Sequence, residues 1–586
     1  MKRTITLSLV AICFAAAPAF AQRGPGGGAQ AASREDGLDP SPVGAPTDLD
    51  TDKFINDWRK SPVRILFGKL AIQDMLTKLE GPDPQHPSRK GAVLTGITAI
   101  SHSNLASGAT ASGREQAGER MVFYTVSGEG TLSSNGKNFD VKEGTGFTLT
   151  PEFDFKLTAT KPLEFYVRTE PIPAGTTSSP NILVVSRWDN DRRVGAHWAH
   201  IGNGGPQGLS LITVAPRTMP QPHSHPAEEC WLAVKGETVL SLGKVTMKMT
   251  PGMAYKIPPS GIAAHSNINL GEEPVELIFM GPANNGGGRG RGGPGGPGAQ
   301  GQPAPGRGGQ PATDYARLDN SSYNYGNEQD IDMFMGDWHN GFPRIEHGNM
   351  YFRDMLTALR GNDPLHPQRR GGVLTNAQAV SYVQLEPNSS AHPVEGELKD
   401  VQETFIVNSG AGIITSGGKK TELQKDMAFI LTPGLDYKLT AIGDKYMTFY
   451  AVTEKLPEGF TPKSTLTVVD NRNKPQATNL WVDKERPLIT REDGLSQYDS
   501  LTQVEQGNMT MSRPYSDNPG VEEIWIATDG DVDMLLGKEL RKLPAGTAYR
   551  VPSTGITAHT QINVSGKPAK YIYMVKQVER KIEASK

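Results

Sequence analysis

An internal repeat constrains this chain more than any other feature of its sequence. Residues 74–95 and 354–375 are identical at 15 of 22 positions, with an offset of 280. The correspondence continues in three further pairs of segments: 57–65 with 337–345, 147–159 with 429–441, and 255–269 with 549–563. A repeat of this length indicates one structural unit that has been duplicated. The 586 residues are also too many for a single hydrophobic core, so several domains are expected.

Each unit divides again into two halves of about 110 residues, which is the size of a small domain. Short β-like runs such as 121–128 and 404–410 dominate, and Gly, Pro and Asn turns separate them. We expect one helix in each unit, near 62–80 and near 343–360. The sequence therefore predicts a mainly β fold with four small antiparallel barrels arranged in two pairs.

Three histidines and one glutamate form the strongest candidate site. His223, His225 and Glu229 lie in the segment PHSHPAEECW, and His265 lies 36 residues after Glu229. Side chains at i and i+2 of a strand point to the same face, and Glu229 keeps that parity. The intervening segment 234–250 reads as a hairpin that would bring His265 back over the other three residues. Imidazoles with one carboxylate suit Fe(II), Mn(II), Ni(II), Cu(II) or Zn(II), so one divalent transition metal is predicted here.

The same residues resemble the two-part signature of the cupin superfamily. His223, His225 and Glu229 are followed by Gly236 in the first part, and the second part contains Gly252, Pro258, His265 and Asn269. One residue is added between Pro258 and His265 relative to the usual form of the signature. The resemblance implies antiparallel jelly-roll barrels, with the metal near the mouth of one of them. Two bicupin units would then account for the duplicated chain.

The predicted organisation follows from the repeat and from two tracts without large apolar residues. The segment 284–311 is rich in Gly and Pro and is expected to be a flexible tether. The predicted parts are a signal peptide (1–21), a flexible tail (22–53), barrel 1 (54–175), barrel 2 (176–281), a linker (282–327), barrel 3 (328–456) and barrel 4 (457–586).

The first 21 residues predict export from a bacterial cell. Lys2 and Arg3 precede an apolar run, and Ala19-Phe20-Ala21 is a small-residue cleavage site. Cleavage removes Cys13 and leaves Cys230 alone, so no intrachain disulfide is expected, and Cys230 is expected to face away from the metal. A periplasmic or secreted protein is predicted, with no membrane segment after cleavage. The near balance of 60 basic and 63 acidic residues argues against a nucleic-acid partner.

The other three barrels depart from the complete ligand set. In barrel 4, Tyr515 and Asp517 replace the first two histidines, whereas Glu523 and His559 are retained. These four residues would hold a hard ion, and they make a poorer site for late transition metals. Whether barrel 4 binds anything is left open.

Barrels 1 and 3 are interpreted as degenerate. They have Asp154 and Asp436 near the place of the last histidine. Barrel 3 also clusters His392, Glu395, Glu397 and Glu403, but the segment HPVEGE (392–397) is interpreted as a solvated loop, and a structural role is favoured there. A repeated DP-x-HP-x-R element lies outside the barrel motifs. It would pair its Arg with its Asp or hold an anion, and a role in the fold is favoured. Its residues are Asp83, His86 and Arg89 in the first unit, and Asp363, His366 and Arg369 in the second.

The resemblance to cupins implies dioxygenases, decarboxylases, isomerases or lyases, and the fold alone does not choose among them. We expect a metal-dependent enzyme that acts on a small oxygenated compound, with oxidative cleavage as the favoured reaction. The alternative is a non-catalytic protein that binds a small ligand or metal, or a purely structural barrel array. No general acid or base is identified; Glu228 is a candidate, and Trp231 is expected to line the pocket. Self-association into a homo-oligomer stays open.

Overall fold

In the computed structural model, the described residues belong to the two repeated units and not to the segment between them. The described residues are 50–172, 182–187, 198–201, 209–220, 228–243, 245–258, 265–280, 329–479, 482–515, 517, 519–537, 539–554 and 557–576. The predicted signal peptide, most of the predicted tail, the whole predicted linker, His223 and His225 lie outside these residues.

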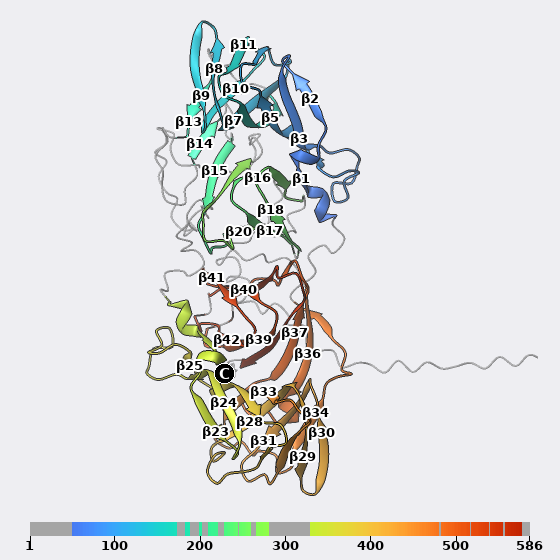
Figure 1. Cartoon of the computed structure of the whole chain (residues 1–586), viewed down its shortest axis with the longest axis vertical. Coiled ribbons are helices and arrows are strands. Elements are labelled where there is room, and N and C mark those ends of the chain that lie inside the picture. The colour runs from blue at the N-terminus through green and yellow to red at the C-terminus, as the bar shows by residue number, and fades with distance from the viewer. Residues whose placement is uncertain are drawn as a thin grey trace, which may run out of the picture.

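The fold is mainly β, and nearly all strand pairs are antiparallel, as the sequence predicts. In the described residues the helical segments are short 3-10 turns: η1 (Thr51–Phe54), η2 (Trp58–Lys60), η3 (Ile331–Phe334), η4 (Trp338–Asn340) and η5 (Arg491–Asp493). The strands form sets that are consistent with four barrels, and barrels 2 and 4 lie at the middle of the long molecule (Figure 1).

Barrels 1 and 3 have the same construction of one large and one small sheet. The large sheet of barrel 1 has the order β13-β10-β7-β12-β5-β3-β2, with β4 beside β3. Its strands are β2 (Val63–Leu66), β3 (Leu70–Lys78), β4 (Ala92–Leu94), β5 (Ala99–Leu105), β7 (Glu119–Ser127), β10 (Thr145–Leu149), β12 (Leu163–Pro171) and β13 (Val184–Ser186). The small sheet contains β6 (Thr110–Gly113), β8 (Glu129–Ser134), β9 (Lys137–Lys142) and β11 (Phe155–Ala159).

Barrel 3 repeats this order in β34-β31-β28-β33-β26-β24-β23, with β25 beside β24. Its large sheet contains β23 (Pro343–Glu346), β24 (Met350–Ala358), β25 (Gly372–Leu374), β26 (Ala377–Leu385), β28 (Val401–Ser409), β31 (Met427–Leu431), β33 (Met447–Lys455) and β34 (Thr467–Asp470). The small sheet contains β27 (Ser390–Ala391), β29 (Ala411–Ser416), β30 (Lys419–Leu423) and β32 (Lys438–Ile442).

Barrels 2 and 4 each have one sheet of their own and share a second. The sheet of barrel 2 contains β1 (Ile55–Asp57), β14 (Trp198–Ile201), β15 (Leu209–Val214), β16 (Cys230–Lys235), β19 (Met253–Lys256) and β21 (Val275–Met280). That of barrel 4 contains β22 (Met335–Asp337), β35 (Ala477–Asn479), β36 (Asp483–Thr490), β37 (Ser500–Gln506), β39 (Glu522–Asp529), β42 (Thr547–Arg550) and β44 (Ala569–Lys576).

The shared sheet joins the two units into one body. Its order is β20-β17-β18-β38-β43-β40-β41. The strands are β17 (Thr238–Leu242), β18 (Val245–Met249) and β20 (His265–Ile268) from barrel 2, and β38 (Thr510–Met511), β40 (Val532–Leu536), β41 (Glu539–Leu543) and β43 (His559–Asn563) from barrel 4. The contacts are reciprocal, because Val245 pairs with Thr510 while Thr218 pairs with Glu539.

Within each unit the two barrels exchange strands across the predicted boundary. The strand β1, at the start of the range predicted for barrel 1, pairs with β19 of barrel 2, and β22 pairs with β42 in the same way. In the other direction, β13 pairs with β10 of barrel 1, and β34 pairs with β31 of barrel 3. The barrels of a unit are therefore connected by backbone hydrogen bonds as well as by side-chain packing.

The helix predicted near 62–80 and near 343–360 is wrong, since these segments form β2 and β3, and β23 and β24. The reason is a β-bulge between Asp74 and Leu76. It breaks the two-residue alternation, so that the buried residues Leu70, Ile72, Met75 and Leu76 have a spacing that resembles a helical period. The same irregularity lies between Asp354 and Leu356 in the second unit.

Gly252 allows the segment that contains β1 and Trp58 to pack closely against barrel 2. It has a φ of +93°, and a Cβ added there would lie 2.4 Å from Trp58 Nε1. Gly136 has a similar φ of +71° with nothing near its added Cβ. We expect Gly136→Ala to cost about 1 kcal/mol of unfolding free energy, and Gly252→Ala about 2–4 kcal/mol because it also overpacks the contact with Trp58. Thermal unfolding of both variants measures the difference, and equal losses would contradict the importance of this contact.

Among the described residues, no helix has the length and apolar character that crossing a membrane requires.

Candidate metal centres

Glu229 and His265 come together in barrel 2, as the sequence predicts for half of the site. Glu229 lies immediately before β16, and His265 begins β20, where it pairs with Leu242 of β17. His265 Nε2 lies 3.2 Å from Glu229 Oε1, and both side chains are buried. The other two predicted ligands, His223 and His225, lie outside the described residues, so the four-residue site stays a prediction.

The side chain of Trp231 fixes the orientation of the candidate ligand Glu229. Its Nε1 donates a hydrogen bond of 2.6 Å to Glu229 Oε1, and the indole is buried. Such outer contacts orient metal ligands in proteins. Cys230, between these two residues, is buried in the apolar core, and burial raises the pKa of its thiol well above the usual value. This buried position indicates a structural role for Cys230.

Barrel 4 repeats the same local frame. His559 Nε2 lies 2.9 Å from Glu523 Oε1, and Trp525 Nε1 donates to the same oxygen over 2.6 Å. Tyr515 also donates to it over 2.6 Å, and ligand atoms of Asp517, Glu523 and His559 all lie within 4.8 Å of one another. The two replacements that the sequence identifies in barrel 4, Tyr515 and Asp517, therefore face the two retained ligands.

The chemistry of the barrel 4 residues fits a cation. Glu523 is fully buried, and its Oε2 has no hydrogen-bond partner among the described residues. Burial lowers the pKa of His559, so its imidazole is neutral and offers a lone pair near pH 7. Burial, followed by the nearby Glu523 carboxylate, raises the pKa of Tyr515 well above its usual value, so that Tyr515 is a hydrogen-bond donor and not an anion.

Glu228 does not face the candidate ligands. Its carboxylate accepts hydrogen bonds from the backbone N–H groups of Thr95, at 2.8 Å, and Gly96 in the loop after β4. Glu522 makes the corresponding bonds to Thr375 and Asn376 in the second unit. Glu228 therefore joins barrel 2 to barrel 1, which argues against its candidate role as an acid or base.

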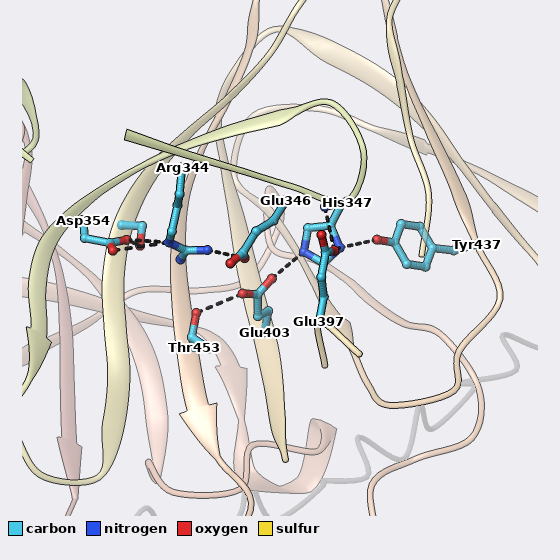
Figure 2. A network of polar contacts seen from close by, with 9 residues as sticks. Arg344, Glu346, His347, Asp354, Glu397, Glu403, Tyr437 and Thr453 are labelled. Atoms are coloured by element: carbon cyan, nitrogen blue, oxygen red, sulfur yellow. Dashed lines mark hydrogen bonds and ion pairs between the residues drawn. The ribbon is translucent and has the colours of Figure 1, made fainter. Parts of the chain in front are cut away.

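A cluster in barrel 3 was missed by the sequence analysis. Glu346, His347 and Glu403 place ligand atoms within 4.8 Å of one another (Figure 2). Glu403 lies beyond the predicted loop 392–397 and is buried in β28, where its register matches that of Glu523 in β39. An alignment of VQETF with VEEIW would have revealed Glu403. His347 carries no such signal, because it comes from the β23–β24 hairpin, outside both motifs.

The repeated DP-x-HP-x-R element pairs its Asp with its His. His86 Nδ1 lies 2.8 Å from Asp83 Oδ2, and the second copy, His366 and Asp363, has 2.7 Å. Arg89 instead contacts Glu80. The predicted Arg–Asp pair is therefore wrong, and these side chains lie at the surface.

Comparison with known proteins identifies part of the chain. Residues 210–281 match the family model of the cupin domain. Oxalate decarboxylase from Bacillus subtilis, in a structure whose subject is its Mn(II) centres, is 12% identical, with a TM-score of 0.33, over 43% of this chain and 78% of that chain. Lactobacillus farciminis oxalate decarboxylase in a formate complex is also 12% identical, with a TM-score of 0.33, over 43% and 88%. A search of curated protein sequences gave no match.

Proposed function

Because residues 210–281 match the family model of the cupin domain, we propose that barrel 2 is the metal centre of an enzyme that acts on a small oxygenated compound. The observation that carries the proposal is the buried pair of Glu229 and His265, whose Oε1 and Nε2 lie 3.2 Å apart. His223 and His225 complete the proposed ligand set. A carboxylate and three imidazoles suit a divalent first-row metal, and Fe, Mn, Ni, Cu and Zn are the candidates.

Neighbouring residues of this chain would orient the candidate ligands before any metal or substrate binds. Trp231 holds one oxygen of Glu229, so the carboxylate does not rotate freely. The shared sheet holds His265 beside it through the pairing with Leu242. Four protein ligands leave one or two positions open, where a bound metal supplies Lewis acidity to an oxygen-containing substrate. Oxidative cleavage is the first reaction to test, and the N-terminal segment supports export to the periplasm or the outside of the cell.

The alternative is a protein that binds a small ligand or metal without turnover. Barrel 4 favours it, because Asp517, Glu523 and His559 fit a cation there but make a poorer site for the late transition metals. Turnover distinguishes an enzyme from a binding protein. Both would bind the metal, but only the enzyme would release product at a steady rate.

The experiment compares the wild-type chain with His265→Ala and Glu229→Gln after removal of metal and reloading with Mn²⁺, Fe²⁺ or Zn²⁺. We expect each variant to lose more than about 100-fold in metal affinity, beyond the usual effect of outer contacts, and to bind about one ion fewer per chain. His86→Ala is the control, because it removes an exposed histidine remote from the motif. Unchanged metal content in both variants would rule out the barrel 2 centre, and loaded protein without turnover of oxygenated acids or aromatics would favour the binder.

A further inference from the structure

We propose that barrel 3 contains a separate divalent-cation site built by Glu346, His347 and Glu403. Their ligand atoms lie within 4.8 Å of one another. His347 and Glu403 are both 1% exposed, and His347 Nε2 lies 2.7 Å from Glu403 Oε2. The histidine comes from the turn between β23 and β24, so this site takes its nitrogen ligand from a different part of the barrel than His265 in barrel 2.

The equivalent place in barrel 1 is apolar. There, Leu66, Phe67 and Met121 occupy the positions of Glu346, His347 and Glu403. Strand registers fix this correspondence: Leu66 pairs with Leu70 as Glu346 pairs with Met350, and Met121 pairs with Leu149 as Glu403 pairs with Leu431. Phe67 and His347 have the same turn conformation, with φ of 49° and 52°. The fold therefore accepts apolar side chains at all three positions, and packing does not explain the polar ones.

A fourth position is also apolar in barrel 1 and polar in barrel 3. Phe155 of barrel 1 contacts the ring of Phe67, with centroids 4.8 Å apart. Its counterpart Tyr437 places its hydroxyl 2.6 Å from His347 Nδ1 (Figure 2). When a cation takes the Nε2 lone pair of His347, the ring proton lies on Nδ1 and is donated to the Tyr437 oxygen. This contact sets the tautomer that a ligand histidine requires.

Negative charge in the cluster exceeds the charge that the neighbouring cation supplies. Arg344 is shared between Asp354 and Glu346, as Figure 2 shows. His347 is left as the partner of both Glu403 and Glu397, whose Oε2 accepts the backbone N–H of His347 at 2.8 Å. Burying carboxylates without enough positive charge is unfavourable, and a bound cation would remove that cost. Two carboxylates and one imidazole suit Mn²⁺, Fe²⁺ or Zn²⁺.

The test replaces the cluster residues of barrel 3 with the residue types that barrel 1 has at the corresponding positions. In the full chain, His347→Phe combined with Glu403→Met should bind about one Mn²⁺ fewer than the wild type, as measured by the electron paramagnetic resonance signal of free Mn²⁺ during titration. The same loss should appear in a Glu229→Gln/His265→Ala background, which makes the result independent of barrel 2. Equal Mn²⁺ stoichiometry with and without the barrel 3 substitutions would overturn the proposal.

A second variant guards against a general folding defect. Glu403→Gln keeps the size of the side chain and a hydrogen-bonding oxygen while removing the charge. It should weaken Mn²⁺ binding at this site at least about tenfold while the circular dichroism spectrum is unchanged. Mn²⁺ should also raise the unfolding temperature of the Glu229→Gln/His265→Ala protein, and this rise should disappear when Glu403→Gln is added. If Mn²⁺ stabilises both proteins equally, the cluster is a hydrogen-bond network that binds no cation.

Discussion

Glu170→Ala should lower the unfolding free energy by about 3–5 kcal/mol, because it removes the buried carboxylate that pairs with two buried guanidinium groups. Glu170 Oε1 accepts from Arg120 Nη2 at 2.6 Å, and Glu170 Oε2 pairs with Arg168. All three side chains are at most 5% exposed, so water does not replace the lost carboxylate. Calorimetric unfolding of the variant beside the wild type measures the loss.

The second unit supplies a matched control. Glu454 pairs in register with Gln402 as Glu170 pairs with Arg120. Its carboxyl receives hydrogen bonds from Gln402 and from the backbone of Gln497, and burial raises its pKa. Glu454→Gln should therefore cost much less than Glu170→Gln, because no guanidinium of the described residues pairs with Glu454. Equal losses in the two units would show that the charge of Glu170 does not set its contribution.

The protein should also lose stability as the pH rises from about 4 to about 8, and Asp483 is the reason. Burial raises the pKa of this carboxyl from 3.8 to about 8. Its Oδ1 accepts from Ser512 at 2.7 Å, whereas its Oδ2 is buried without a hydrogen-bond partner among the described residues. The folded chain therefore holds a proton through this pH range that the unfolded chain has released. Because the folded state binds more protons, its stability falls as the pH rises, and the decrease is complete above the folded pKa.

Asp483→Asn should remove this part of the pH dependence. At about 1.36 kcal/mol per pKa unit, the shift corresponds to a loss on the order of 4–6 kcal/mol between the two ends of the range. The variant should be about as stable as the wild type at pH 4 and more stable at pH 9, in denaturant unfolding followed by tryptophan fluorescence. The exposed Asp470 is the control, since Asp470→Asn should leave the slope between pH 5 and pH 8 unchanged. A wild-type slope that survives in Asp483→Asn would refute the assignment.

Much of the architecture is visible in the sequence because the duplication and the two-residue alternation are local signals. The β-rich fold and the pairing of Glu229 with His265 both follow from them. The bulge at Asp74 hides a strand because it shifts the alternation by one residue. The role of Glu228 could not be read from its position, because its partner Thr95 lies 133 residues away in another barrel. His347 joins Glu403 in the same way, through a contact between a turn and a distant strand that no local pattern encodes.

The reciprocal pairing of Val245 with Thr510 and of Thr218 with Glu539 has the form of the contact in a two-fold dimer. In a dimer of identical subunits, any change in one subunit appears in both. Here the partners are parts of one chain, held at high effective concentration by covalent connection, so each can change alone. Arg217 illustrates this freedom: it bonds Asp533 across the junction at 2.9 Å, while the matching position on the other side is Met509. Fusion thus allows the halves to specialise while they remain assembled, and Asp517 beside His559 is the kind of difference that such independence permits.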